Sequence, residues 1–239
     1  MAIMGSFFSD DRERKERMRR YRIMGWMFMA LAGGLVAGAA WAGPAAPRGV
    51  DRGAAPKPAG KYELLKEPST HEPGKVKLTE FADFYCPHCH AFEQALVPFI
   101  EKEFSGKVEV NMVGFPVISG KLPTAFEMYE QARAMGKGVE MKKALFRTIH
   151  KDGLHVFDRV IRETLVREVG LDPAAFEAGL ASGKPMEAVA AGRKWGERIK
   201  VQYTPTVLLD GNIKVEGENL NPENLKTVIA SILSKDRKR

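Results

Sequence analysis

Residues 80–90 read Glu-Phe-Ala-Asp-Phe-Tyr-Cys-Pro-His-Cys-His, and this segment decides the fold. It joins an apolar run to a helical pattern that continues through Ile100, and it holds Cys86 and Cys89, the only cysteines in 239 residues. A Cys-x-x-Cys pair at a strand-to-helix junction is typical of a redox dithiol. The free N–H groups and the dipole at a helix N-terminus favour a thiolate there. The spacing therefore predicts Cys86 as the attacking sulfur and Cys89, one helical turn later, as its disulfide partner.

Three other interpretations use the same residues. Cys86 to His90 also spells Cys-x-x-Cys-His, the attachment pattern of a c-type haem, with His90 as axial ligand. The two thiols together with His88 and His90 could bind a metal, although structural zinc sites usually bring a second ligand pair that this sequence lacks. The thiols could also form an inert pair. Pro87 between the cysteines and the apolar helix after them favour the dithiol, so we expect neither a cofactor nor a metal.

The segment resembles the active-site segment of the DsbA-like thiol:disulfide oxidoreductases of the thioredoxin superfamily, and its Pro87-His88 dipeptide is typical of their oxidising members. A second match lies at 201–211, Val-Gln-Tyr-Thr-Pro-Thr-Val-Leu-Leu-Asp-Gly, which resembles the cis-proline loop of that superfamily and the strand after it. The resemblance covers residues 61 to 235. It implies an α/β thioredoxin fold over 61–239, with an inserted all-helical subdomain at about 120–200.

The resemblance also implies roles for the residues of the first motif. Cys86 would form the mixed disulfide, and Cys89 would resolve it. His88 would stabilise the Cys86 thiolate, which favours the reduced form and makes the protein an oxidant. Pro87 would restrict the turn that opens the helix.

Three further residues receive implied roles. Pro205 would be cis, and Thr204 before it would contact the sulfurs. Glu80 would be a buried proton carrier for Cys89. A glutamate at a strand edge or in an ion pair is the alternative for Glu80, and Asp83 is a second acid close enough to be confused with it.

Periodicity and capping residues predict the remaining elements. The first predicted elements are strands at 75–84 and 107–115, which flank a helix at 90–104 that Pro98 could kink. Helices are then predicted from the repeats Met141-Leu145-Ile149 and Phe157-Ile161-Leu165-Val169, from the cap Asp172-Pro173, and over 184–200. Strands at 206–210 and 213–216 follow, and the last helix is capped by Asn221-Pro222. Phe92, Leu96 and Ile100 are expected in the core. Met128, Met135 and Met141 suit either ordinary packing or an apolar peptide groove.

The N-terminal 60 residues have a different composition. Residues 1–22 are basic and are expected to stay in the cytoplasm, and residues 23–42 are uncharged. That run suits either a transmembrane anchor or the apolar region of an export signal cleaved near Ala42. Residues 43–60 contain thirteen Gly, Pro or Ala out of eighteen, which predicts a linker.

The net charge of +7 is concentrated at the two ends of the chain, where 1–22 has seven basic and four acidic residues and 235–239 has four and one. The charge therefore does not indicate a nucleic-acid partner.

The sequence thus predicts an exported thiol:disulfide oxidoreductase of the bacterial cell envelope, periplasmic or tethered to the inner membrane, and most readily an oxidant. The expected partners are reduced or misoxidised client proteins and a membrane redox partner that regenerates the disulfide. A reductase or isomerase of the same fold is the first alternative. A haem electron carrier that uses Cys86, Cys89 and His90 is the second.

Overall fold

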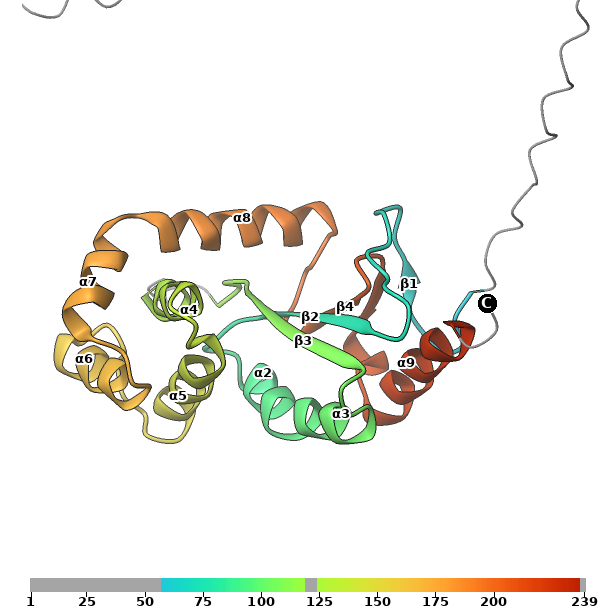
Figure 1. Cartoon of the computed structure of the whole chain (residues 1–239), viewed down its shortest axis with the longest axis horizontal. Helices are drawn as coiled ribbons and strands as arrows, with labels where there is room; N and C mark the ends of the chain where they lie inside the picture. The colour runs from blue at the N-terminus through green and yellow to red at the C-terminus, as the bar shows by residue number, and fades with distance from the viewer. Residues whose placement is uncertain (1–56, 119–123, 237–239) are drawn as a thin grey trace, which may run out of the picture. The chain divides into compact units, whose positions relative to one another are not determined.

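The computed structural model describes residues 57–118 and 124–236 (Figure 1). These residues include a mixed sheet with the strand order β1-β5-β4-β2-β3. The strands are β1 (Glu63–Leu64), β2 (Val76–Ala82), β3 (Val108–Gly114), β4 (Thr206–Leu209) and β5 (Ile213–Glu216). β2 pairs with β3 in parallel and with β4 in antiparallel, and β5 is antiparallel to both β4 and β1.

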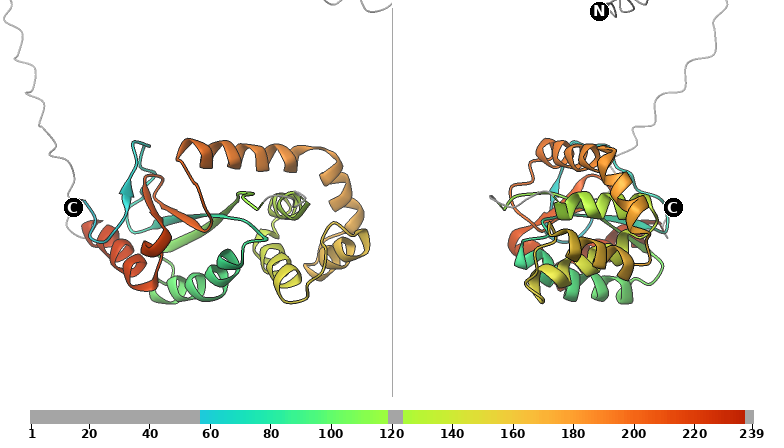
Figure 2. Two further views of the ribbon diagram at one scale, coloured as in Figure 1. Left: turned by 180° about the vertical axis from the view of Figure 1, so that it is seen from behind. Right: turned by 90° about the vertical axis from the view of Figure 1, so that its left-hand side faces the viewer.

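Helices cover both faces of the sheet (Figures 1 and 2). Between β2 and β3 lie α2 (Pro87–Ala91), the wider turn η1 (Phe92–Leu96) and α3 (Val97–Glu103), and the chain ends with η2 (Gly217–Asn219) and α9 (Pro222–Asp236). Between β3 and β4 lie α4 (Thr124–Ala134), α5 (Gly138–His150), α6 (Arg159–Glu168), α7 (Pro173–Ala181) and α8 (Lys184–Arg198). Helices α4 to α8 form the expected insertion, so the predicted α/β fold with an inserted helical subdomain is confirmed.

Alternation along β2 places the functional side chains. Val76 and Leu78 pack with α3 and α9, whereas Phe81 packs on the opposite face against Trp195 of α8. Because successive side chains of a strand point to opposite faces, Glu80 shares the face of Val76 and Leu78 and points toward the helix that follows β2. An acid is thereby placed in the core beneath the Cys-x-x-Cys turn.

Two sequence predictions need correction. The predicted helix through Phe157 begins only at Arg159, because the Asp158 carboxylate accepts hydrogen bonds from the N–H groups of Val160 and Ile161 and caps the helix there. Phe157 therefore lies before the helix and is half-exposed.

The helix disturbance predicted at Pro98 is found as a wider turn just before the proline. Val97 donates its N–H to the carbonyl of Phe92, five residues back, which widens the helix over η1. Pro98 follows at the start of α3. Proline has no N–H, so in an uninterrupted α-helix it would remove one backbone hydrogen bond. The wider turn is therefore the local adjustment that lets the active-site helix continue through a proline.

The methionines and the expected core residues are placed as packing residues. Met128 and Met141 are fully buried in the cluster that joins the insertion to the active site, and Met135 packs against that cluster. Phe92 and Ile100 are buried and Leu96 packs beside them. Ordinary packing therefore accounts for these side chains.

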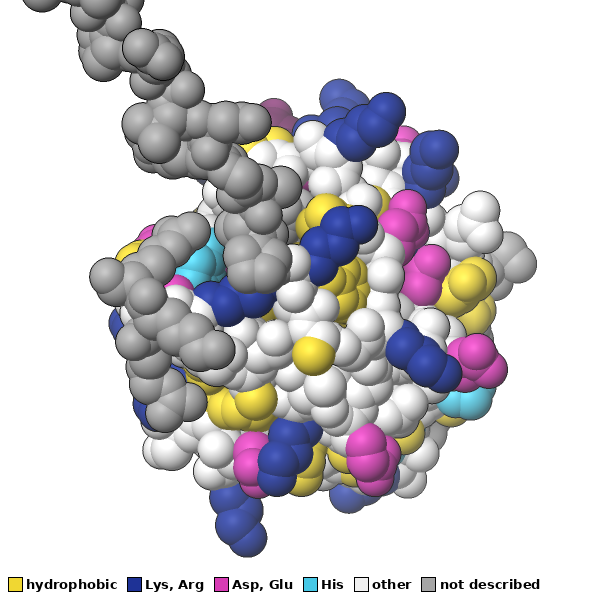
Figure 3. Space-filling model, turned by 90° about the vertical axis from the view of Figure 1, so that its right-hand side faces the viewer, with side chains coloured by type: hydrophobic (Ala, Val, Ile, Leu, Met, Phe, Trp, Pro, Cys, Tyr) yellow, Lys and Arg dark blue, Asp and Glu magenta, His cyan; other side chains and the backbone are white. Residues whose placement is uncertain are grey.

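The predictions for 1–22 and 23–42 lie outside the described residues, as does most of the linker at 43–60. Over 57–118 and 124–236, no helix has both the length and the apolar character that crossing a membrane requires. On the end of the domain that faces away from the insertion, basic and acidic side chains are interspersed (Figure 3).

A histidine bridges two aspartates at the end of the sheet that is remote from the cysteines. His71 Nδ1 lies 2.8 Å from Asp210 Oδ2, and its Nε2 lies 2.9 Å from Asp236 Oδ1. The same aspartates accept backbone N–H groups of Lys77 and Gly74. Burial acts to lower the pKa of His71, but the hydrogen bonds to Asp236 and Asp210 outweigh it and raise the pKa above 6.5.

This cluster predicts a pH-dependent contribution to stability. Because the His71 pKa is higher in the folded than in the unfolded chain, its contribution is fully present below about pH 6.5 and is lost as the pH rises through the folded pKa. His71→Gln should therefore lower the thermal midpoint most at about pH 5.5 and least at about pH 9. Thermal unfolding, with His155→Gln as an exposed control, measures the difference. A deficit that is independent of pH would contradict the bridge.

Candidate active site

Cys86 stands at the point where the chain leaves the sheet and enters a helix. β2 ends at Ala82, and Cys86 is the residue before the first helical turn, with φ −84° and ψ 119°. Pro87 occupies the first turn, where the absence of an N–H costs nothing. The exposed fraction of Cys86 is 6%, whereas that of Cys89 is 0%. Only the first sulfur is therefore placed to meet another molecule.

The second motif folds against the first. β4 pairs with β2, so the loop that leads into β4 lies beside the turn that ends β2. The Thr204–Pro205 peptide bond is cis, as the resemblance implied. Cys86 Sγ lies 3.4 Å from the carbonyl oxygen of Thr204, to which the thiol donates. The sheet topology thus brings together two motifs that are more than one hundred residues apart in the sequence.

Cys89 lies in a different environment from Cys86. Cys86 and Cys89 are both buried cysteines. Burial, and next the negative charge of Glu80, raise the pKa of the Cys89 thiol far above its ordinary value. The backbone N–H of Asp83, which lies 3.4 Å from Cys89 Sγ, lowers the pKa of this thiol, and so does the hydroxyl of Thr204. Cys89 therefore leaves a disulfide most easily when a proton is delivered to it.

Glu80 is fully buried, as the resemblance implied for a proton carrier. Burial, followed by the charge of Glu93, raises the pKa of Glu80 well above its ordinary value. A raised pKa favours the protonated carboxyl, and a proton carrier for a buried thiol must be able to hold a proton. A strand-edge position for Glu80 is excluded, because β2 lies between β3 and β4.

Asp83 has a different place from Glu80. Its carboxylate accepts three backbone N–H groups at 2.8 Å, one from Tyr85 in the active-site turn and two from Val117 and Ile118 after β3. Cys86 also donates its N–H to the Asp83 carbonyl at 3.0 Å. Asp83 therefore links the active-site turn to the loop after β3, and both of its carboxylate oxygens accept hydrogen bonds in doing so.

The two histidines of the motif differ. His88 is exposed on the outer side of α2. The His90 ring stacks on His150 of α5, with centroids 4.7 Å apart and planes within 6°, and His150 Nε2 lies 2.8 Å from the carbonyl oxygen of Phe84. Burial, then the charges of His150 and Lys151, lower the pKa of His90. The stacked pair thus ties the active-site helix to the insertion.

Two buried charges near Glu80 were missed from the sequence. Glu93 and Lys142 form an ion pair between η1 and α5, with side chains only 7% and 8% exposed. Glu93 could have been found, because it lies one helical turn after Cys89 on the same helix. Lys142 has no such signal, since it belongs to a helix whose pattern resembles any amphipathic surface helix. Over the described ranges, no group of three or more His, Cys, Asp or Glu is arranged to hold a metal.

A family model described as thioredoxin matches residues 71–231. The chain belongs to the thioredoxin family. Among curated proteins, it is similar to the thiol:disulfide interchange protein DsbA of Haemophilus influenzae, 30% identical over 152 residues that cover 61% of this chain and 71% of that protein. The DsbA of Pseudomonas syringae pv. tomato is 26% identical over 177 residues, with 73% of this chain and 81% of that protein covered. This thioredoxin-family protein is therefore a DsbA-like disulfide oxidoreductase.

Solved structures agree with the fold. The crystal structure of Pseudomonas aeruginosa DsbA superposes with a TM-score of 0.59 at 22% identity, over 75% of this chain and 93% of that one. A Proteus mirabilis DsbA solved with a non-covalently bound peptide superposes with a TM-score of 0.58 at 17% identity, over 77% and 98% of the two chains. These likenesses cover the sheet and the helical insertion together.

Proposed function

We propose that this DsbA-like oxidoreductase is an exported oxidase that introduces disulfides into client proteins through Cys86 and Cys89. The observation that carries the proposal is the asymmetry of the two sulfurs. Cys86 keeps a small exposed area beside the cis-proline loop, whereas Cys89 is fully buried and feels the charge of Glu80. An arrangement of this kind directs an incoming thiolate to one sulfur and leaves the other as an internal leaving group.

The reaction has two exchange steps. A client thiolate attacks Cys86 Sγ, the Cys86–Cys89 bond breaks, and Cys89 leaves as a thiolate that takes a proton from Glu80. A second client thiolate then attacks the client sulfur of the mixed disulfide, and Cys86 leaves as a thiolate. The client loses two electrons as its disulfide forms, and the protein gains them as a dithiol.

The proposed roles of the remaining residues follow from their places. His88 and the N-terminus of α2 stabilise the Cys86 thiolate, which favours the reduced protein and drives the transfer toward the client. The Thr204 backbone before Pro205 offers hydrogen bonds to an extended client segment, as an unpaired strand edge does. Pro87 holds the turn between the sulfurs.

We further propose that the chain works outside the cytoplasm, in the periplasm or an equivalent compartment. The basic 1–22 segment followed by the uncharged 23–42 run supports export, with either retention as an anchor or cleavage near Ala42. The disulfides that an oxidase introduces persist only in compartments where thiols are not kept reduced. Because each turnover leaves a dithiol, the cycle needs a membrane redox partner that accepts two electrons.

The oxidase reaction is tested with a reduced peptide that carries two cysteines. Under anaerobic conditions, one equivalent of oxidised protein should convert about one equivalent of peptide to the disulfide, because thiol–disulfide exchange conserves electrons. Mass spectrometry of both products measures the transfer. Recovery of reduced peptide beside protein that is still oxidised would contradict the proposal. A Soret absorbance band in the purified protein would instead favour the c-type haem alternative at His90.

A further inference from the structure

The buried ion pair between Lys142 and Glu93 connects the helical insertion to the active-site helix. Lys142 lies on α5, and Glu93 lies on η1, one turn after Cys89. Both side chains are more than nine-tenths buried. Removing two charges from water is costly, and replacing such a pair by apolar side chains often leaves stability unchanged or improved. Its stabilising effect alone is therefore a weak explanation for its place beside the dithiol.

Glu80 is the third member of this cluster. Counted as ionised, its two carboxylate oxygens have no hydrogen-bond donor among the described residues. After burial, the charge of Glu93 is the next cause that raises the pKa of Glu80 and so favours its protonated form. On β3, the residue opposite Glu80 is Met112, which offers no charge. Lys142 is thus the cation that acts on the Glu80 carboxyl, and it comes from outside the sheet.

We propose that Lys142 of the helical insertion is a positioning residue for the redox chemistry, holding Glu93 against Glu80 so that the two carboxyls share the proton that Cys89 takes up and releases. The inference rests on the proposed function, because it concerns proton transfer in the exchange steps. It assigns the insertion a part in the chemistry at the buried sulfur, beyond covering the sheet.

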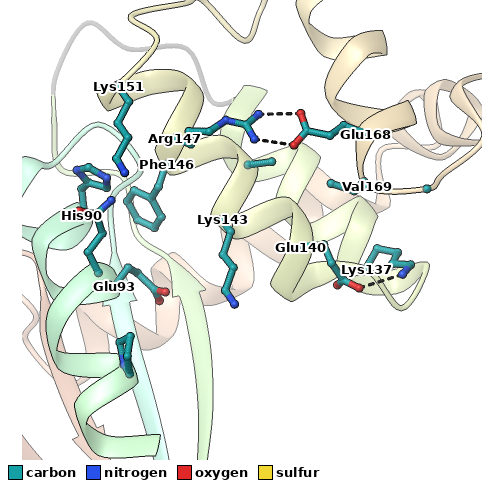
Figure 4. A pocket seen from close by; sticks show the side chains of 14 residues that line it. His90, Glu93, Lys137, Glu140, Lys143, Phe146, Arg147, Lys151, Glu168 and Val169 are labelled. Carbon is teal, nitrogen blue, oxygen red and sulfur yellow. Dashed lines mark hydrogen bonds and ion pairs between the residues drawn. The ribbon is translucent and has the colours of Figure 1, made fainter.

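The pocket beside η1 gives this proton a route to water. A pocket of about 830 Å³ lies between the active-site helix and α5, and Glu93 and His90 line it from one side while Lys143 and Phe146 line it from the other (Figure 4). Glu93 therefore borders the pocket, whereas Glu80 is fully buried. Protons can pass from the pocket to Glu93, then to Glu80, and then to Cys89.

Other ionisable groups also face the cluster. Cys86 approaches from the residue before α2 and Cys89 from α2 itself, and Tyr129 approaches from α4, next to the ion pair between Arg133 and Glu130. Burial raises the pKa of Tyr129 to about 12, so the phenol stays neutral over the working range. Glu80, whose pKa burial raises, and Glu93, which lines the pocket, are therefore the groups that we assign to proton transfer.

The signs of the charge effects make the proposal testable. Lys142 lowers the pKa of Glu80, and Glu93 raises it. In Lys142→Met the carboxyl pair should hold its proton to higher pH, so a base is available to Cys89 only at higher pH. In Glu93→Gln the lysine remains and the competing carboxylate is gone, so the base should be available at lower pH. A pair that serves only stability predicts no such opposite shifts.

The measurement is the release of glutathione from a mixed disulfide preformed at Cys86. Cys89 loses its proton to the carboxyl pair and attacks Cys86 Sγ, the Cys86–Cys89 bond forms, and glutathione leaves as a thiolate. The rate is followed by stopped flow against pH. Near neutral pH we expect about tenfold slower release in Lys142→Met, with the profile displaced upward, and a downward displacement in Glu93→Gln.

Two control variants complete the test. Lys143→Met removes an exposed cation from the same helix and the same pocket lining and should leave the profile in place. Lys142→Arg keeps the charge and should restore the profile if Lys142→Met proves too unstable to study. Displacements in the same direction for Lys142→Met and Glu93→Gln, or none, would overturn the role of Lys142. A wild-type protein that never releases glutathione would instead contradict the proposed function.

Discussion

Cys89→Ser is expected to convert this protein into a trap that stays covalently joined to its clients. The partly accessible Cys86 remains, so a client disulfide still reacts with it. The internal thiol that could release the client is gone, and release is left to a second client thiol. When the variant is exported in place of the wild type, mixed disulfides should accumulate that resist denaturant and disappear on reduction. Non-reducing gels followed by mass mapping of the linked cysteines measure the effect.

Cys86→Ser provides the matched control. Like Cys89→Ser, it leaves one cysteine and one serine in the motif, but the cysteine is at the other position. Its remaining thiol is Cys89, which is fully buried and whose pKa burial raises far above the ordinary value. We therefore expect no accumulated adducts and no exchange activity above that of the buffer. Adducts on Cys89 in this variant, in amounts similar to those on Cys86 in the other, would reverse the assignment of the two sulfurs.

His88→Ala is expected to make the protein a weaker oxidant. A donor or positive charge at residue 88 stabilises the Cys86 thiolate of the reduced form, and a hydrogen bond to a charged group contributes about 1.5–3 kcal/mol. Since about 1.4 kcal/mol corresponds to about 30 mV for a two-electron couple, the reduction potential should fall by about 30–60 mV. Equilibration with glutathione measures it, with His155→Ala as the control histidine. An unchanged potential would remove His88 from the mechanism.

The sequence was sufficient for the parts of the site that local patterns determine. The Cys-x-x-Cys spacing placed Cys86 before a helix and Cys89 inside it, and the order of the elements predicted the strands and the insertion. The cis bond before Pro205 followed from the resemblance of its loop and from nothing in its composition. Caps at Asp172 and Asn221 were predictable because a short polar side chain before a proline is a local signal.

The rest of the site depends on contacts between segments that no local pattern connects. Lys142 meets Glu93 only because α5 packs on the active-site helix, and Asp83 reaches Val117 and Ile118 only because β2 and β3 end at the same edge of the sheet. The start of α6 was misjudged because an apolar repeat through Phe157 outweighed the capping signal of Asp158. Tertiary packing determines the first two of these points, whereas a local cap determines the start of α6.

The most direct test of the central claim is the reduction potential of the Cys86–Cys89 couple in the wild-type protein. The direction of catalysis follows from this value, because two dithiol–disulfide pairs exchange electrons toward the one with the higher potential. Equilibration with glutathione buffers, with the two redox forms separated after acid quenching and alkylation, gives the value. An oxidase of the kind proposed here should have a potential well above the ~−270 mV of thioredoxin. A value at or below that of thioredoxin would contradict the oxidase and favour a reductase of the same fold.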